Sequence, residues 1–74
     1  MSFPKGQVLL FIYDKLSKEK RIYKSAIQEA CGISSITFKR YIGEIRNYYA
    51  KIHPELKIVY DRKKDRYLVR KVGE

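Results

Sequence analysis

The apolar residues change their spacing once along the chain. Over residues 8–16, and again over residues 38–49, they recur at intervals of three and four. This period is typical of an α-helix that buries one face. Over residues 56–69 apolar and polar residues alternate instead, as they do in a β-strand with one buried face. The pattern therefore predicts helices in the first part of the chain and a β-hairpin in the last part.

Local signals set the limits of the first two helices. Pro4 suits the first turn of a helix, where its missing N–H would have had no partner, and we expect this helix over about residues 4–18. Residues 25–28, Ser-Ala-Ile-Gln, have the spacing of a capping box. Gly32 is the residue type that ends a helix in a left-handed conformation. The second helix is therefore expected over about residues 25–31.

A longer third helix is expected over about residues 35–52. Ser34 or Ser35 can cap its first turn, and His53 precedes a proline, a position that disfavours helical geometry. On a helical wheel the apolar face holds Phe38, Ile42, Ile45 and Tyr49. The opposite face holds Ile36, Arg40, Gly43 and Asn47, with Lys39 and Glu44 at its edges. The first face predicts core, and the second predicts a surface open to solvent or to a partner.

The hairpin is expected over about residues 56–72. Its two alternating segments are joined by the charged run Asp-Arg-Lys-Lys-Asp-Arg at residues 61–66. This run has no glycine, so a loop of about three to five residues is favoured over a tight two-residue turn. Residues 21–23, Arg-Ile-Tyr, are also extended in character. The sequence thus predicts one α+β domain over residues 1–74, with three helices followed by a hairpin.

The composition is that of a small, strongly basic, folded domain. The chain has 74 residues, with 17 Lys and Arg against 8 Asp and Glu, and a formal net charge of +9. Its hydrophobic fraction of 45% is too high for a disordered basic tail. A chain of this size hides only about 60–65% of its surface on folding, which leaves little room for a deep substrate cavity. The positive field favours an anionic partner, nucleic acid first and an anionic membrane surface second.

Several kinds of site are excluded by residues that the sequence lacks. A single cysteine, Cys31, rules out an internal disulfide and is expected in the core. A single histidine, His53, rules out an ordinary zinc site. The longest apolar run, residues 8–13, is far shorter than the ~20 residues of a membrane span, and no signal-peptide pattern follows it. The apolar helix faces are needed to build the core, so none is free to insert into a membrane surface. We therefore expect no cofactor, no metal and no membrane partner, and a cytoplasmic, nucleoid-associated protein.

The order of the expected elements is that of a winged helix-turn-helix: a short helix, a glycine turn, a longer helix with a polar outer face, and a basic hairpin. In such a fold the longer helix enters the major groove of DNA while the shorter one lies across the backbone. Residues 27–46, IQEACGISSITFKRYIGEIR, resemble the DeoR-type winged helix-turn-helix of bacterial regulators. Mga-type regulators carry a related unit. The resemblance extends over about residues 5–72.

The resemblance implies a sequence-specific transcriptional regulator that binds double-stranded DNA. Two residues depart from the DeoR-type pattern. Gln28 stands where alanine is usual, and Gly43 lies within the third helix at a cost of about 0.5–1 kcal/mol relative to alanine. The resemblance does not include the ligand-sensing domain of these regulators, so sugar-phosphate sensing is not carried over.

The candidate DNA contacts come from the turn, from the exposed face of the third helix and from the hairpin loop. They are Ser34, Ser35, Ile36, Thr37, Lys39, Arg40, Asn47, Arg62, Lys63, Lys64 and Arg66. Arg40 has a guanidinium group that can fork onto guanine, and Ile36 can contact a thymine methyl group. The loop cations are expected on phosphates. In the alternative interpretation these charges are only solvated and the two serines only cap the helix.

Other functions stay open. The chain is alternatively an accessory or architectural factor of a phage, plasmid or mobile element, similar to an excisionase, or the DNA-binding domain of a larger regulator. A protein-docking module would have a hydrophobic or acidic outer helix face, whereas this face is basic. An enzyme is not expected, because the sequence holds no paired carboxylates, nucleophile set or phosphate-binding glycine loop. Self-association on DNA is expected through Phe3, Leu10, Tyr13 and Tyr48.

Overall fold

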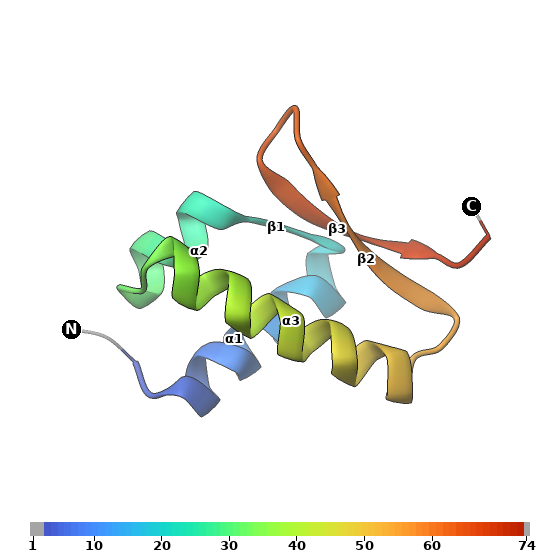
Figure 1. Cartoon of the computed structure of the whole chain (residues 1–74), viewed down its shortest axis with the longest axis horizontal. Helices are drawn as coiled ribbons and strands as arrows, with labels where there is room; N and C mark the ends of the chain where they lie inside the picture. The colour runs from blue at the N-terminus through green and yellow to red at the C-terminus, as the bar shows by residue number, and fades with distance from the viewer. Residues whose placement is uncertain (1–2, 74) are drawn as a thin grey trace.

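Three helices and a three-stranded antiparallel sheet make up the α+β fold of the protein (Figure 1). The computed structural model describes residues 3–73, so residues 1, 2 and 74 of the expected domain lie outside the described residues. The elements follow the order α1 (Lys5–Glu19), β1 (Arg21–Tyr23), α2 (Lys24–Cys31), α3 (Ser35–Ile52), β2 (Leu56–Asp61) and β3 (Arg66–Lys71). The α+β class and the predicted order of helices and hairpin are confirmed.

The sheet has the strand order β1-β3-β2, and both of its strand pairs are antiparallel. The hairpin was predicted, whereas the pairing of β1 with β3 was not. In the register, Tyr67 lies opposite Ile22 on one side and Tyr60 on the other, and Val69 lies opposite Ile58. Ile22, Ile58 and Tyr67 are buried, so this face of the sheet packs on the helices. The residues between them in each strand therefore point to the opposite, outer face.

The core lies between α1, α3 and the inner face of the sheet. The face of α3 that the helical wheel predicts as buried is buried, and Phe38 packs against Tyr67 with ring centroids 5.5 Å apart and ring planes tilted by 56°. Cys31 is buried as expected, and burial raises the pKa of its thiol. The buried residues are Val8, Ile12, Leu16, Ile22, Ile27, Cys31, Phe38, Ile42, Ile45, Tyr49, Ile58 and Tyr67.

The capping box predicted at residues 25–28 is wrong. The helix α2 begins at Lys24, its N-cap is Tyr23, and no side chain caps it. The reason is tertiary: β1 runs directly into α2, and the first N–H of the helix, that of Lys24, donates to the Asp65 carbonyl of the hairpin at 3.4 Å. The side chain of Gln28 instead donates to the carbonyl of Ile33 at 3.4 Å.

The two turns that flank the candidate site have the predicted chemistry. Gly32 adopts a left-handed conformation (φ 66°) and ends α2. Ser34 is the N-cap of α3, and its hydroxyl accepts a hydrogen bond from the Thr37 N–H at 3.1 Å. The hairpin loop spans residues 62–65 and ends with Asp65 in a left-handed conformation (φ 49°). The loop therefore has the length that the absence of glycine predicts.

Candidate nucleic-acid interface

The outer face of α3 is open to solvent and carries the predicted polar set. Ile36 is 73% exposed, and Lys39, Arg40, Gly43 and Asn47 are also exposed. Within residues 3–73 neither Lys39 nor Arg40 forms an ion pair. An exposed isoleucine between unpaired cations is suited to a partner that offers both phosphates and methyl groups.

The carboxylate at the edge of this face is already neutralised. Glu44 pairs with Lys5 of α1 at 3.0 Å. Both side chains are about half exposed, so the pair adds little stability. Its electrostatic consequence is larger, because it removes the negative charge one turn away from Arg40. The outer face of α3 is therefore positive where the sequence shows an acid among the bases.

Two hydrogen bonds between Ser34 and Thr37 fix the N-terminus of α3. The Ser34 hydroxyl donates to the Thr37 hydroxyl oxygen at 3.0 Å while accepting from the Thr37 N–H. The Thr37 hydroxyl keeps its own proton free to donate. Ser35 and Thr37 are half-buried, and Ser34 is exposed. Capping thus accounts for Ser34, and the exposed helix N-terminus beside it favours an anion.

The hairpin loop presents Arg62, Lys63 and Lys64, all of them exposed. Both acids of the loop region are engaged locally. One Asp61 oxygen accepts from the Lys63 N–H at 3.1 Å, and Asp65 accepts a 2.6 Å hydrogen bond from the Tyr60 hydroxyl, which raises the pKa of that tyrosine. Among the described residues the three loop cations form no ion pair. They are available to an anionic partner.

Arg66 differs from the other predicted contacts because it holds strands together. Its Nε donates to Asp61 at 3.0 Å, one of its terminal nitrogens reaches the Tyr23 hydroxyl at 3.5 Å, and its side chain is only 19% exposed. The hydrogen bond from Arg66 lowers the pKa of Asp61, and likewise lowers that of Tyr23. A phosphate would have to compete with Asp61 for this guanidinium group.

Sequence reasoning missed Arg46, which joins the two candidate surfaces. Its Nε donates to the Ile58 carbonyl of β2 at 3.3 Å, and its guanidinium lies 5.6 Å from the centroid of the Tyr67 ring. Arg46 lies two turns beyond Phe38 on α3, and only the position of the sheet reveals its role. The contact fixes α3 against the hairpin and so sets the spacing between the helix face and the loop.

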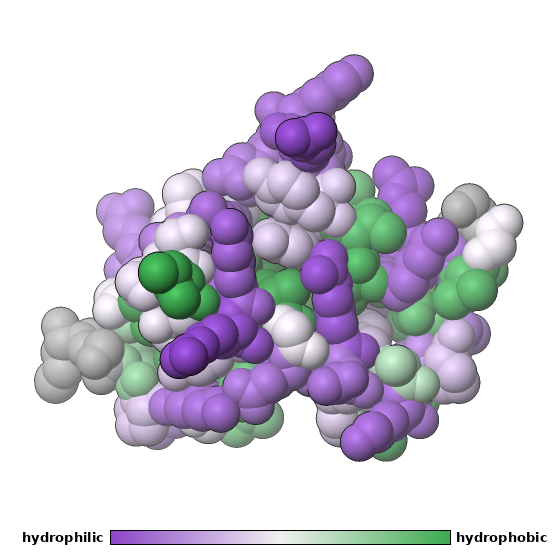
Figure 2. Space-filling model, in the orientation of Figure 1, coloured by the Kyte–Doolittle hydropathy of each residue, from purple (hydrophilic) through white to green (hydrophobic). Residues whose placement is uncertain are grey.

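Figures 1 and 2 share one orientation, in which α3 crosses the front of the molecule and the hairpin loop projects at the top. In this view hydrophilic side chains lie over both elements, with hydrophobic ones between them (Figure 2). The two elements that carry the unpaired cations, α3 and the hairpin, are therefore both seen from one side of the molecule (Figure 1). Asn47 lies on α3 about 10 Å beyond Arg40, farther along the same helix.

Two other features were sought in the described part of the chain: a metal-binding group of side chains and a membrane-spanning helix. Within residues 3–73 no three His, Cys, Asp or Glu side chains gather in a group that could hold a metal ion. None of the helices described is long and apolar enough to cross a membrane. Comparison of the chain with protein-family models, with curated proteins and with solved structures finds no match.

Proposed function

We propose that this chain binds double-stranded DNA as a winged helix-turn-helix. In this proposal α2 and α3 form the helix-turn-helix, α3 enters the major groove, and the β2–β3 hairpin is the wing on the phosphate backbone. The resemblance of residues 27–46 to DeoR-type regulators supports the role of a sequence-specific transcriptional regulator.

The observation that carries the proposal is the pattern of charge compensation. Glu44, Asp61 and Asp65 could have neutralised the helix face and the loop, but each is bonded to another partner. The cations that remain on α3 and on the loop are unpaired among the residues described. Uncompensated cations on neighbouring exposed elements lower stability through mutual repulsion, and a phosphate backbone removes that repulsion.

The exposed residues divide into two roles. Arg40 and Ile36 reach from α3 to base edges, the first to guanine and the second to a thymine methyl group. Lys39 and the loop cations contact phosphates, which fixes the position of the protein but not the sequence. The remaining candidate contacts lie at the start of α3 or farther along it and complete the backbone contacts: Ser34, Ser35, Thr37 and Asn47.

The salt dependence of duplex binding tests the proposal. With about five to seven cations on phosphates, the logarithm of the association constant should fall against the logarithm of salt concentration with a slope of about −5 to −6. Fluorescence anisotropy from low to physiological salt measures this slope. Lys15→Gln is the control, because Lys15 is paired with Glu19 on α1 and its loss should leave the slope unchanged. A flat response, or tighter binding to single strands, contradicts the proposal.

A further inference from the structure

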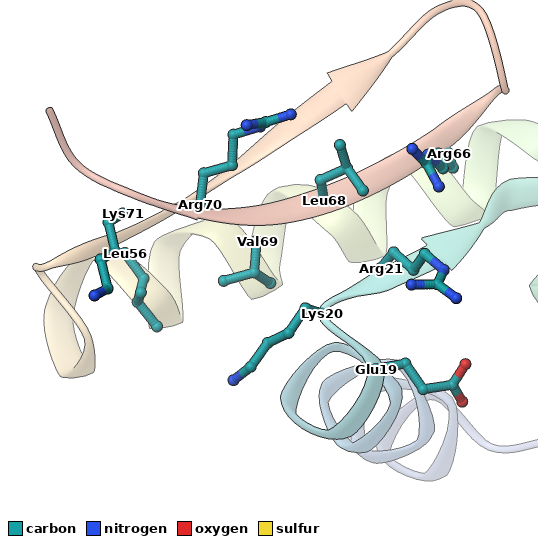
Figure 3. Close-up of a pocket in the computed structure, with 9 residues that line it drawn as sticks. All are labelled: Glu19, Lys20, Arg21, Leu56, Arg66, Leu68, Val69, Arg70 and Lys71. Atoms are coloured by element: carbon teal, nitrogen blue, oxygen red, sulfur yellow. The ribbon is translucent and has the colours of Figure 1, made fainter. Parts of the chain in front are cut away.

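A second basic surface lies along the edge of β3; it shares only Arg66 with the candidate contacts named above and includes no residue of α3 or of the hairpin loop. Because β1 pairs with only the first half of β3, a groove of about 520 Å³ remains beside the second half. It is shown in Figure 3. The groove is lined by Glu19, Lys20, Arg21, Leu56, Arg66, Leu68, Val69, Arg70 and Lys71.

The charges of this groove are unbalanced. Its single carboxylate, Glu19, is paired with Lys15 at 2.9 Å, and its Arg66 is paired with Asp61 at 3.0 Å. Over residues 3–73 the other groove cations, at positions 20, 21, 70 and 71, form no ion pair. Arg70 also lies directly opposite Lys57 in the sheet, and like charges placed so destabilise a strand pair.

Lys20 supplies an independent observation. It has a left-handed backbone (φ 63°), a conformation that is unfavourable for residues other than glycine and asparagine. Two hydrogen bonds hold it there: its N–H donates to Leu16 at 3.0 Å, and its carbonyl accepts from Val69 at 2.9 Å. Glycine would satisfy the same backbone with less strain. A lysine at this strained position points to a role for its side chain, which lines the groove on the side of Val69.

The groove is remote from the helix face proposed to read DNA. None of its lining residues belongs to α3 or to the loop. Tyr67 faces α3, so the alternation of β3 directs Leu68 and Arg70 away from it. Figure 3 shows these two side chains on one side of the strand and Val69 on the other, facing Lys20.

We propose that this groove binds the phosphate backbone of a second DNA segment, so that one chain joins two duplexes. Arg21 and Arg70 can each fork onto a phosphate, Lys20 and Lys71 add point charges, and Leu68 offers an apolar surface to the sugars. The inference rests on the proposed function for its first duplex. It favours an architectural role among the alternatives that the sequence leaves open.

A titration followed by ¹⁵N NMR separates the two proposals. The probe is a blunt duplex of about 10 base pairs, added first to one equivalent and then in excess. We expect the first equivalent to shift the amides of Lys39, Arg40 and Lys64, and the excess to shift those of Arg21 and Arg70. If only the α3 and loop amides shift, the groove proposal is wrong and the proposed function stands. If the groove amides shift first or alone, both are overturned.

Bridging is measured by energy transfer between donor-labelled and acceptor-labelled copies of the duplex. We expect Arg21→Gln/Arg70→Gln to lower the transfer about tenfold at physiological salt, since two phosphate contacts are lost, and to leave binding of the first duplex unchanged. The matched control is Lys18→Gln/Lys51→Gln, which removes the same charge from two lysines that do not line the groove and should retain the transfer. Equal losses in the two double variants overturn the proposal.

The variant Lys20→Gly tests whether a loss of bridging comes from the groove itself or from a loss of folding. Because glycine relieves the left-handed strain, this variant should melt at a higher temperature than the parent chain while its bridging falls about threefold or more. Bridging that is retained in Lys20→Gly and in Arg21→Gln/Arg70→Gln, but lost in Leu10→Glu, would assign it to contacts between protein copies and overturn the proposal.

Discussion

Gly43 lies on the exposed face of α3 between Arg40 and Asn47. Nothing lies within 4 Å of the position that a Cβ would take there, so Gly43→Ala introduces no clash. We expect this substitution to raise the free energy of unfolding by about 0.5–1 kcal/mol, because glycine loses more backbone entropy than alanine. Urea unfolding followed by circular dichroism measures the change.

Gly43→Ala also tests whether this part of α3 lies in the proposed DNA interface. If the backbone of α3 lies close to DNA at Gly43, the added methyl group lowers duplex affinity even though the protein is more stable. The matched control is Gly6→Ala on α1, where nothing lies within 4 Å of a Cβ position either; it should leave duplex affinity unchanged. Raised stability with unchanged affinity would place Gly43 outside the interface.

Arg40 and Lys64 should give two separate phenotypes. Arg40→Ala is expected to cost about 1–3 kcal/mol of binding and to relax preference at one base pair, because a guanidinium fork onto guanine is lost. Lys64→Ala should weaken all sequences alike and reduce the salt slope by about one. Binding to a panel of duplexes selected from random sequence measures both. Equal, sequence-independent losses would show that α3 does not read bases.

At the scale of elements, one arginine adds a side-chain contact to the backbone pairing between the hairpin and β1. The guanidinium of Arg66, on β3, is bonded to Asp61 of β2 and to Tyr23 of β1, so a single side chain spans all three strands. This contact sets the direction of the hairpin just before the loop cations. The loop can then be presented to phosphates from a fixed base.

The Asp61–Arg66 pair should give the protein an acid-dependent stability. Arg66 lowers the pKa of Asp61, so the folded state favours the carboxylate. Its contribution is complete above the unfolded-state pKa of about 3.9 and is lost as the pH falls through the lower folded-state pKa. Asp61→Asn should therefore lower the melting temperature at pH 7 and flatten its decline in acid.

Melting curves from neutral to strongly acidic pH check this prediction. The control is Asp14→Asn, which removes an exposed pair with Lys18 on α1 and should keep the shape of the parent curve. An Asp61→Asn variant whose melting temperature declines in parallel with the parent chain would rule out a stabilising role for the pair.

The elements that sequence reasoning predicted well are those specified by local signals. The range expected for α3, about residues 35–52, agrees with the observed Ser35–Ile52, because its apolar stripe, a serine cap at residue 34 or 35 and Pro54 all indicate the same helix. The start of α2 was not predicted correctly, because the backbone carbonyl of Asp65 in the hairpin takes the place of a side-chain cap. The pairing of β1 was not predicted either, since a three-residue strand has no local signal that names its partner.

The candidate site likewise has a part that local sequence predicts and a part that depends on tertiary contacts. The wheel predicted the exposed face around Arg40 from helical period alone. The contacts of Arg46 and Arg66, and the groove beside Lys20, depend on segments that come together only in the folded chain. Charge compensation is therefore invisible in the sequence, where Asp61 and Glu44 simply stand beside lysines and arginines.

At the scale of the whole molecule, the net charge and the exposed apolar surface have opposite effects on association between copies of the chain. The net charge of +9 makes free copies repel one another. Yet Leu10 is 70% exposed and Tyr48 is 47% exposed, and they border a hollow of about 360 Å³ between α1 and α3 that Tyr13 also lines. This apolar patch is the surface at which two copies can meet once an anion has reduced their repulsion.

We therefore expect association on DNA and little of it in free solution. One winged domain buries roughly 600–1,000 Å² on DNA, the low end for a specific site, and two linked reading heads gain discrimination from the spacing of their half-sites. Sedimentation should show a monomer at micromolar concentration, while affinity per site should be higher on a two-site than on a one-site duplex. Leu10→Glu should abolish that difference, and Lys18→Gln, which lowers the charge of α1 by the same one unit, should retain it. A stable dimer without DNA, or equal affinity per site on both duplexes, would show that the chain acts alone.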